Sequence, residues 1–255
     1  MIDRKKVICI IPARLKSSRF PRKVIALLGG KPLIQWVWEA ALKIPFFDEV
    51  FFAIDSEETA QVIESFGGRF YMTSTECESG TDRLVEIQRK GLVQGDIWVN
   101  WQADEPFISE KILQDLLISP RKDLADVWTL KTRISNPSQI IDPNCPKVVC
   151  DQQGFALYFS RSPIPYYQNP QGLELTYFKH IGLYAYSDEA LKKISYMPPS
   201  ELAQAESLEQ LRFLVHGLKI QVNETLEETI GIDLPEHLAA AEQHIRKNLY
   251  SFSHI

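Results

Sequence analysis

Short apolar runs alternate with segments of helical periodicity in the first half of the chain. Three β-branched runs predict strands at residues 7–11, 50–54 and 97–101. Helical spacing of apolar side chains predicts helices over residues 32–44 and 56–66, and another after Ser79 and Gly80. Strands embedded in such alternation form a parallel sheet covered by helices on both faces. We therefore predict an α/β fold with three layers, α/β/α, around a mostly parallel sheet.

The pattern changes after about residue 134, where connections become rich in proline and asparagine. Further strands are predicted at residues 127–134, 155–159 and 180–186, and long helices at residues 201–215 and 235–249. Leu238, Ala241 and Ile245 form an apolar stripe on the last helix. The expected organisation is an α/β core over residues 1–134, a smaller β-rich lobe over 135–200, and helices over 201–255 that complete the core.

Composition narrows the class of partner. The chain has 255 residues and a net charge of −5. This charge argues against the broad basic surface that proteins use to bind nucleic acid or anionic membranes. No apolar run approaches the roughly 18 residues of a membrane span. The four cysteines show no metal-binding spacing, which indicates a reducing compartment. We expect a cytoplasmic protein with no nucleic-acid or membrane partner.

A basic loop directly follows the first predicted strand. It places five cations within ten residues: Arg14, Lys16, Arg19, Arg22 and Lys23. In open α/β sheets, ligands collect at the carboxyl ends of strands, where backbone amides and cations can meet a polyphosphate. One arginine guanidinium can bind two phosphate oxygens at once, and lysine supplies a mobile point charge. The loop therefore predicts phosphate binding; the alternative is a solvated basic loop with no ligand.

Two aspartates are candidate metal ligands. Asp104 follows the predicted strand at residues 97–101, and Asp233 precedes the last predicted helix. Mg²⁺ prefers oxygen ligands and often takes only one or two protein carboxylates, leaving other positions to water and phosphate. The competing interpretation makes Asp104 a turn residue and Asp233 an ordinary helix cap.

Seven motifs occur in an order that resembles the 3-deoxy-manno-octulosonate cytidylyltransferases, or CMP-Kdo synthetases. They are Pro12-Ala13-Arg14-x-x-Ser17-Ser18-Arg19-Phe20-Pro21-x-Lys23, Ser79-Gly80-Thr81-Asp82-Arg83, Gln102-x-Asp104-Glu105-Pro106, Ala156-Leu157-Tyr158-Phe159-Ser160-Arg161, His180-Ile181-Gly182-Leu183-Tyr184, Glu206-x-x-Glu209-Gln210-Leu211-Arg212 and Gly231-Ile232-Asp233. The resemblance covers almost the whole chain. Related sialic acid synthetases carry a Gly-Gly-Ser-Lys type of loop at the first motif, which favours the Kdo branch.

The resemblance implies that the enzyme converts CTP and Kdo into CMP-Kdo and pyrophosphate for lipopolysaccharide assembly. It also implies a Mg²⁺ cofactor and a homodimer, with the β-rich lobe contributing to sugar binding and to the dimer. The implied catalytic residues are Arg14, Lys23 and Asp104, and the implied metal ligands are Asp104 and Asp233.

The remaining roles are also implied by the resemblance. The nucleotide-binding residues would be Pro12, Ala13, Arg14, Arg19, Lys23, Ser79, Gly80 and Arg83. The sugar acid would be held by Gln102, Arg161, His180, Tyr184, Glu209 and Gln210. Structural alternatives are open for three of these, since Tyr184 fits strand packing, His180 a satisfied core histidine and Glu209 a surface charge.

Three positions depart from the family pattern. The family usually has glycine at Ala103 and Arg22, and threonine at Leu234. A methyl group at Ala103 is tolerable only if that residue avoids positive φ, and Arg22 adds a charge beside the triphosphate site. Neither change removes a chemical group.

Other functions fit parts of the pattern. An alternating α/β sequence alone also suits a nucleotide-dependent oxidoreductase, although the glycine fingerprint of dinucleotide-binding folds is missing. A nucleotide sensor without turnover would keep the pocket and lose the metal ligands. A third alternative is a cytidylyltransferase for a related sugar acid, such as 8-amino-Kdo or a sialic acid.

Overall fold

The computed structural model describes residues 5–17, 20–118, 124–168 and 175–252. The chain forms two compact units. The first unit comprises Lys6–Glu110 and Thr229–Ile255, and the second comprises Lys111–Glu228 with Met1–Lys5.

The first unit holds four parallel strands and the helices between them. Its elements are β1 (Val7–Ala13), the short 3₁₀ helix η1 (Lys23–Ile25), β2 (Leu27–Leu28), β3 (Lys31–Pro32), α1 (Leu33–Ala41), β4 (Glu49–Ile54), α2 (Glu57–Ser65), β5 (Phe70–Met72), α3 (Gly80–Arg89), β6 (Ile97–Asn100) and α9 (Glu236–Phe252). The strands lie in the order β6-β1-β4-β5, and β2 pairs with β3 in a separate hairpin.

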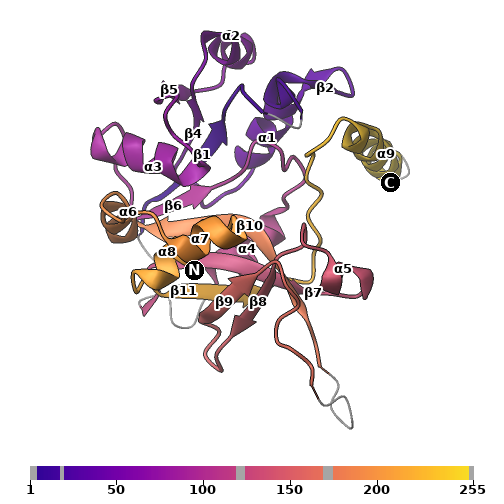
Figure 1. The fold of residues 1–255 in the computed structure, drawn as a ribbon. Helices are drawn as coiled ribbons and strands as arrows, with labels where there is room; N and C mark the ends of the chain where they lie inside the picture. The colour runs from indigo at the N-terminus through magenta and orange to yellow at the C-terminus, as the bar shows by residue number, and fades with distance from the viewer. Residues whose placement is uncertain (1–4, 18–19, 119–123, 169–174, 253–255) are drawn as a thin grey trace. The chain divides into compact units, whose positions relative to one another are not determined.

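The strand order places helices on both faces of this sheet. The chain steps outward from β1 to β4 and β5 and then returns past β1 to β6. Because parallel crossovers are right-handed, a reversal of direction moves the connecting helix to the opposite face. Figure 1 shows α1 and α3 on opposite sides of β1 and β4. This arrangement confirms the predicted α/β class.

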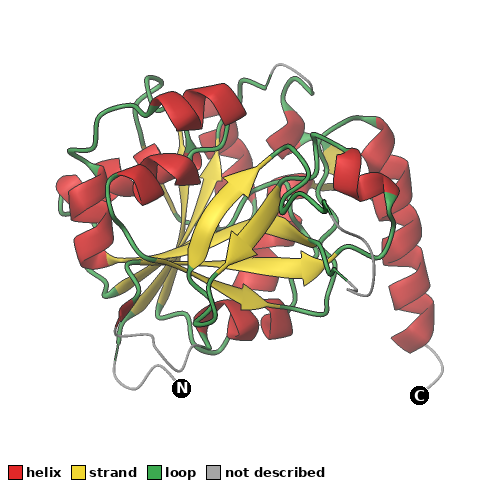
Figure 2. Ribbon diagram, turned by 60° about the horizontal axis from the view of Figure 1, so that its bottom comes forward, coloured by secondary structure: helices red, strands yellow, loops and turns green. Residues whose placement is uncertain are grey.

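Buried apolar strands explain why these segments form the centre of the unit. All seven residues of β1 are buried, as are all four of β6. Strands buried on both faces need continuous apolar runs, which the sequence supplies. Helix α9, the long helix that runs to the C-terminus in Figure 2, packs Ala241 in a cluster with Leu28 and Leu33. Leu238 and Ile245 pack against the same cluster, which confirms the predicted stripe.

The second unit contains a mixed sheet. Its elements are α4 (Glu110–Leu117), β7 (Val127–Arg133), α5 (Ser138–Ile141), β8 (Lys147–Cys150), β9 (Ala156–Ser160), β10 (Phe178–Ser187), α6 (Asp188–Ile194), α7 (Glu201–Glu206), α8 (Gln210–Val215) and β11 (Ile220–Glu224). Strand β11 pairs with β7 in parallel, whereas the β7–β10, β10–β8 and β8–β9 pairs are antiparallel. The division of roles at residues 134 and 200 stays a prediction.

One predicted helix is wrong. Residues 201–215 do not form a continuous helix, because α7 ends at Glu206 and α8 begins at Gln210. Between them Ser207 adopts a left-handed conformation, with φ 49°. The Leu208 amide donates to the Ala203 carbonyl at 3.0 Å, which closes the last turn of α7. Several short elements, among them β5, β8, β11, α4 and α6, also form where the sequence pattern predicted none.

Candidate active site

Three loops leave the sheet of the first unit at the same edge. Ala13 at the end of β1 pairs with Ile54 at the end of β4, and Ile10 of β1 pairs with Asn100 at the end of β6. All three strands are parallel, so the segments that follow them emerge together. The basic loop, here residues 14–22, therefore begins beside the segments that start at Asp55 and Trp101.

Lys23 brings the two predicted metal ligands together. Its Nζ lies 2.5 Å from Asp104 Oδ2 and 3.3 Å from Asp233 Oδ1. The Ile232 amide donates to the Asp104 carbonyl at 2.9 Å, which fixes the segment before α9 against the loop after β6. Lys23 itself is only 9% exposed. Two carboxylates that are distant in sequence thus lie beside one ammonium group, and metal binding by them stays a prediction.

The carboxylates of Asp104 and Asp233 suit a hard cation that takes few of its ligands from the protein. Among the residues that the structure describes, no cluster of three histidine, cysteine, aspartate or glutamate side chains could hold a metal ion. Asp104 and Asp233 supply two carboxylates, which is the number that Mg²⁺ often takes when phosphate and water complete its shell. The Lys23 ammonium occupies the place between them where a positive charge is favoured.

A cavity of about 200 Å³ opens beside this ion-pair group. Its lining residues are Pro12, Arg14, Ser17, Lys23, Val24, Gln102, Ala103, Asp104 and Asp233. The structure therefore collects predicted nucleotide, sugar and metal residues around one space. Ala103 does not have a positive φ, so its methyl group causes no backbone strain.

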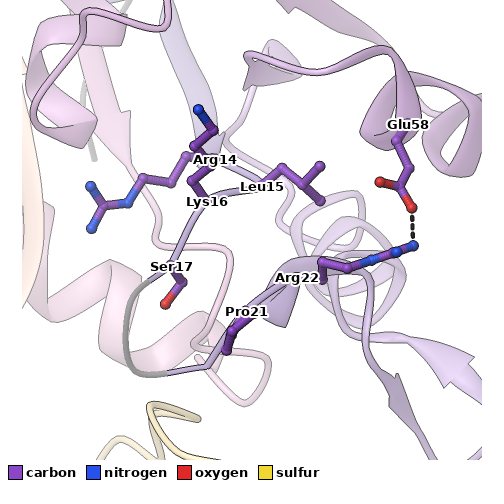
Figure 3. Close-up of a pocket in the computed structure, with 7 residues that line it drawn as sticks. All are labelled: Arg14, Leu15, Lys16, Ser17, Pro21, Arg22 and Glu58. Carbon is purple, nitrogen blue, oxygen red and sulfur yellow. Dashed lines mark hydrogen bonds and ion pairs between the residues drawn. The ribbon is translucent and has the colours of Figure 1, made fainter.

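The basic loop also borders a wider groove of about 540 Å³. Figure 3 shows Arg14 on one side of the loop, whereas Leu15 and Arg22 point to the other. Arg22 adopts a left-handed conformation with φ 59°, and its guanidinium forms an ion pair with Glu58 of α2. The charge that Arg22 adds is therefore balanced locally. Arg19, a predicted triphosphate contact, lies outside the described residues.

The start of α3 packs closely against the sheet edge. Ser79 caps the helix by accepting a hydrogen bond from the Asp82 amide, and the Asp82 carboxylate accepts one from the Ser79 amide. A Cβ at Gly80 would lie 3.1 Å from Pro12 and 3.2 Å from the Asn100 side chain. A side chain at Gly80 would therefore require these neighbours to shift by a few tenths of an ångström. The predicted nucleoside residues Pro12, Ser79 and Gly80 thus lie close together.

Arg83 is held by the protein itself. The residue is 2% exposed, and its Nη2 donates to Asp55 Oδ2 at 2.8 Å. Its Nη1 donates to Thr73 Oγ1 at 2.6 Å and to the Ser74 carbonyl at 3.2 Å. These contacts favour a supporting role for Arg83, and its predicted contact with the nucleotide stays a prediction.

Glu105 is a titratable group that the sequence analysis did not single out. Burial raises its pKa to about 8, and the neighbouring charges of Asp104 and Asp233 act in the same direction, against a smaller lowering by Lys23. Its Oε2 atom is buried without a hydrogen-bond partner in the structure. Near neutral pH the Glu105 carboxyl is therefore mostly protonated, which avoids a third negative charge beside Asp104 and Asp233.

In the second unit, His180 and Tyr184 form one polar cluster. The His180 Nε2 atom lies 2.9 Å from the Tyr184 hydroxyl and 3.0 Å from Thr129 Oγ1. The pairing of β10 with β7 shifts register between Ile181 and Tyr184, and the ring centroids of His180 and Tyr184 lie 5.4 Å apart. Burial against Phe159 and Tyr184 lowers the pKa of His180 to about 3. The ring is therefore neutral at physiological pH.

Arg161 forms a clamp on backbone carbonyls. Its Nε donates to the Glu206 carbonyl at 2.6 Å, Nη1 to the Pro143 carbonyl at 2.7 Å and Nη2 to the Ser207 carbonyl at 3.1 Å. The Glu206 carboxylate in turn accepts from the Ser160 hydroxyl and the Arg161 amide. This geometry supports the turn between α7 and α8, and sugar binding by Arg161 stays a prediction.

Gln210 and Glu209 lie at the start of α8 in the same unit. Gln210 is 5% exposed, and its Nε2 is a buried donor without a partner in the structure. Buried donors are normally satisfied, so this amide suits a polar ligand or a bound water. The Glu209 carboxylate lies 3.5 Å from Nη2 of Arg212.

Comparison with known proteins identifies close relatives over nearly the full chain. The cytidylyltransferase family model matches residues 8–220. The 3-deoxy-manno-octulosonate cytidylyltransferase of Thermodesulfovibrio yellowstonii is 43% identical and covers 96% of this chain and 99% of its own length. The protein of the same name from Porphyromonas gingivalis is 44% identical, with 94% and 97% coverage.

Solved structures agree with this result. A CMP:2-keto-3-deoxy-manno-octonic acid synthetase in complex with CTP superposes with a TM-score of 0.89 at 41% identity, covering 95% of this chain and 99% of its own. The 4-diphosphocytidyl-2C-methyl-D-erythritol synthase of Anaerococcus prevotii superposes with a TM-score of 0.60 at 14% identity, which shows the fold alone.

Proposed function

This chain belongs to the cytidylyltransferase family, and we propose that it transfers CMP from CTP to Kdo, giving CMP-Kdo and pyrophosphate. The activated sugar serves lipopolysaccharide biosynthesis. Relatives at 43% and 44% identity carry the name of this activity over nearly their whole length. The observation that carries the proposal is the joint placement of Arg14, Lys23 and Asp104 around one cavity in a chain similar to a CTP-bound synthetase.

The reaction requires little covalent chemistry from the protein. The anomeric hydroxyl of Kdo attacks the α-phosphorus of CTP, the bond to the bridging oxygen breaks, and pyrophosphate leaves with that electron pair. Charge spreads over the phosphoryl oxygens, so catalysis depends on positioning and electrostatic stabilisation. Arg14 and Lys23 are the described cations that line the cavity and can meet this charge.

We assign a Mg²⁺ ion to Asp104 and Asp233. When bound, the ion would neutralise phosphate charge and could lower the pKa of a coordinated hydroxyl. Lys23, which now bridges both carboxylates, would then be free to turn toward the nucleotide phosphates. This exchange would let one lysine serve both as a counter-ion for the two carboxylates and as a phosphate contact.

The acceptor is tested by pyrophosphate release with CTP, Mg²⁺ and one sugar acid at a time. Kdo should support turnover, and 8-amino-Kdo and a sialic acid test the neighbouring specificities. Turnover with a sialic acid and none with Kdo would show that the acceptor is a sialic acid and not Kdo. Nucleotide binding with no pyrophosphate from any sugar acid would indicate a sensor.

The nucleotide is tested by replacing CTP with UTP. Cytosine presents an amino donor where uracil presents a carbonyl, and a buried acceptor left unpaired costs about 1–3 kcal/mol. We expect kcat/KM to be at least about tenfold higher with CTP. Equal values for both nucleotides would contradict recognition of the cytosine amino group.

We also propose a homodimer. In the second unit, Ile141, Leu157 and Tyr166 are 74%, 62% and 84% exposed, and these large apolar side chains are candidate contacts with another chain. One chain has a mass of 29.2 kDa, and light scattering should give twice this value. Leu157→Asp should shift the protein toward monomer, whereas Leu42→Asp at an exposed site of the first unit should not.

We assign the reaction to the cytoplasm. All four cysteines of the chain are free thiols, which fits a reducing compartment. None of the described helices is long and apolar enough to cross a membrane. Fractionation of cells that carry a tagged copy would test this assignment.

A further inference from the structure

A carboxylate with no predicted role of its own lies beside the start of the basic loop. Asp55 is the first residue after β4, and its Oδ1 accepts a hydrogen bond from the Leu15 amide at 3.1 Å. Leu15 is the second residue after β1, whose last residue pairs with the last residue of β4. Asp55 therefore ties the loop to the sheet at the point where the loop departs.

The second oxygen of Asp55 is held from another direction. Asp55 Oδ2 accepts from Arg83 Nη2 at 2.8 Å, and the two side chains are 10% and 2% exposed. Arg83 is fixed in turn by Thr73, whose hydroxyl donates to the Ile54 carbonyl at 2.9 Å. With both oxygens engaged and little solvent access, the carboxylate has one orientation. It presents a rigid acceptor to the Leu15 amide.

We propose that Asp55 is a positioning residue for Arg14. The Leu15 nitrogen belongs to the same planar peptide unit as the Arg14 carbonyl, so a fixed Leu15 amide also fixes the backbone on the C-terminal side of Arg14. Arg14 lines the cavity with Lys23 and Asp104. Asp55 thus acts on the nucleotide through Leu15 and Arg14, a role that rests on the proposed function.

The chain contains a matched control at the opposite end of the same two strands. Asp48, the residue before β4, accepts a hydrogen bond through Oδ2 from the Val7 amide at the start of β1, at 2.7 Å. Asp48 and Asp55 therefore make the same kind of carboxylate-to-amide bond between β1 and β4. They lie about 20 Å apart, given ~3.3 Å per residue along a strand. Only Asp55 borders the basic loop.

Three variants test the proposal. Asp55→Asn removes the charge that pairs with Arg83, and Asp55→Glu keeps the charge and shifts the carboxylate by one methylene. Asp48→Asn is the control. For each variant we would measure exchange of the Leu15 amide, the Kd for CTP by calorimetry, kcat and KM for CTP, and the melting temperature.

Hydrogen exchange of the Leu15 backbone amide should be faster in both Asp55 variants. The affinity for CTP or kcat should fall about tenfold or more, because a small displacement of a charged contact weakens binding and catalysis strongly. Asp48→Asn should lower the melting temperature with wild-type CTP binding and exchange at Leu15. If Asp55→Asn does not fold, Asp55→Glu retains the buried ion pair and decides the question.

Two results would overturn the proposal. One is faster exchange at Leu15 with unchanged CTP binding and turnover, which would leave Asp55 a purely structural residue. The other is unchanged exchange at Leu15, which would show that the hydrogen bond does not hold the loop. Failure of the wild-type enzyme to turn over CTP would instead reject the proposed function, and exchange at Leu15 is measured independently of turnover.

Discussion

The ammonium of Lys23 lies 2.5 Å from the Asp104 carboxylate, although the two residues are 81 positions apart. Asp233, 210 positions from Lys23, approaches the same ammonium at 3.3 Å. Gathering two carboxylates on one cation predicts coupled behaviour, since each member changes the electrostatic environment of the others.

Asp104→Asn and Asp233→Asn should each reduce turnover by roughly a hundredfold or more, because each removes a full negative charge from the proposed metal site. If both carboxylates bind one ion, the turnover of the double variant should be scarcely lower than that of the less active single variant. Steady-state rates across a Mg²⁺ titration measure this. Wild-type turnover in Asp233→Asn would mean that Asp233 serves only the start of α9.

Lys23→Ala should lower kcat more than it raises the Kd for CTP, because the ammonium would meet charge that develops during transfer. The variant also leaves Asp104 and Asp233 without the cation that separates them. Added Mg²⁺ should therefore raise the melting temperature of Lys23→Ala more than that of the wild type. An equal rise in both proteins would argue against metal binding between these carboxylates.

Arg161→Lys should destabilise the protein by about 1–3 kcal/mol, because one ammonium cannot replace three directed donors to the carbonyls of Pro143, Glu206 and Ser207. Urea denaturation measures the loss. A matched change at an exposed arginine, Arg133→Lys, should be nearly neutral. Normal stability with a raised KM for Kdo would instead identify Arg161 as a sugar contact.

Arg22→Gly should preserve or increase stability, whereas Arg22→Val should lower it by about 1–2 kcal/mol. The reason is the φ of 59° at Arg22, which glycine adopts freely and a β-branched residue resists. The exposed ion pair with Glu58 that both variants lose contributes little. The free energies of unfolding of the two variants test this, and equal values would show that backbone conformation at Arg22 is unimportant.

Stability should fall as the pH drops below about 6.5, in part because of His180. Its pKa is lowered from 6.5 to about 3 in the folded state, so between these values the unfolded chain binds a proton that the folded chain does not. The stabilisation is complete above the unfolded pKa and is lost toward pH 3. Free energies of unfolding at about pH 7.5 and about pH 5 should differ less in His180→Gln than in wild type. His216→Gln, at an exposed histidine, should keep the wild-type difference.

Local pattern by itself determined the first unit's main elements. The strands β1, β4 and β6 and the helices α1, α2 and α3 lie within a few residues of their predicted positions, because long apolar runs and helical periodicity are local properties. The same pattern placed the basic loop at the carboxyl end of β1, and the resemblance identified the family that the comparisons show.

Tertiary structure decided what those residues contact. The helical periodicity of residues 201–215 does not predict the break at Ser207. At this break, Arg161, which is distant in sequence, donates hydrogen bonds to the carbonyls of Glu206 and Ser207. Asp55 drew no attention in sequence because its bond to Leu15 depends on the pairing of β1 with β4. Lys23, Asp104 and Asp233 were candidates from the sequence, but their contacts with one another also depend on the fold. Such contacts follow from the order of strands in a sheet, which periodicity does not encode, because periodicity records only which face of an element is buried.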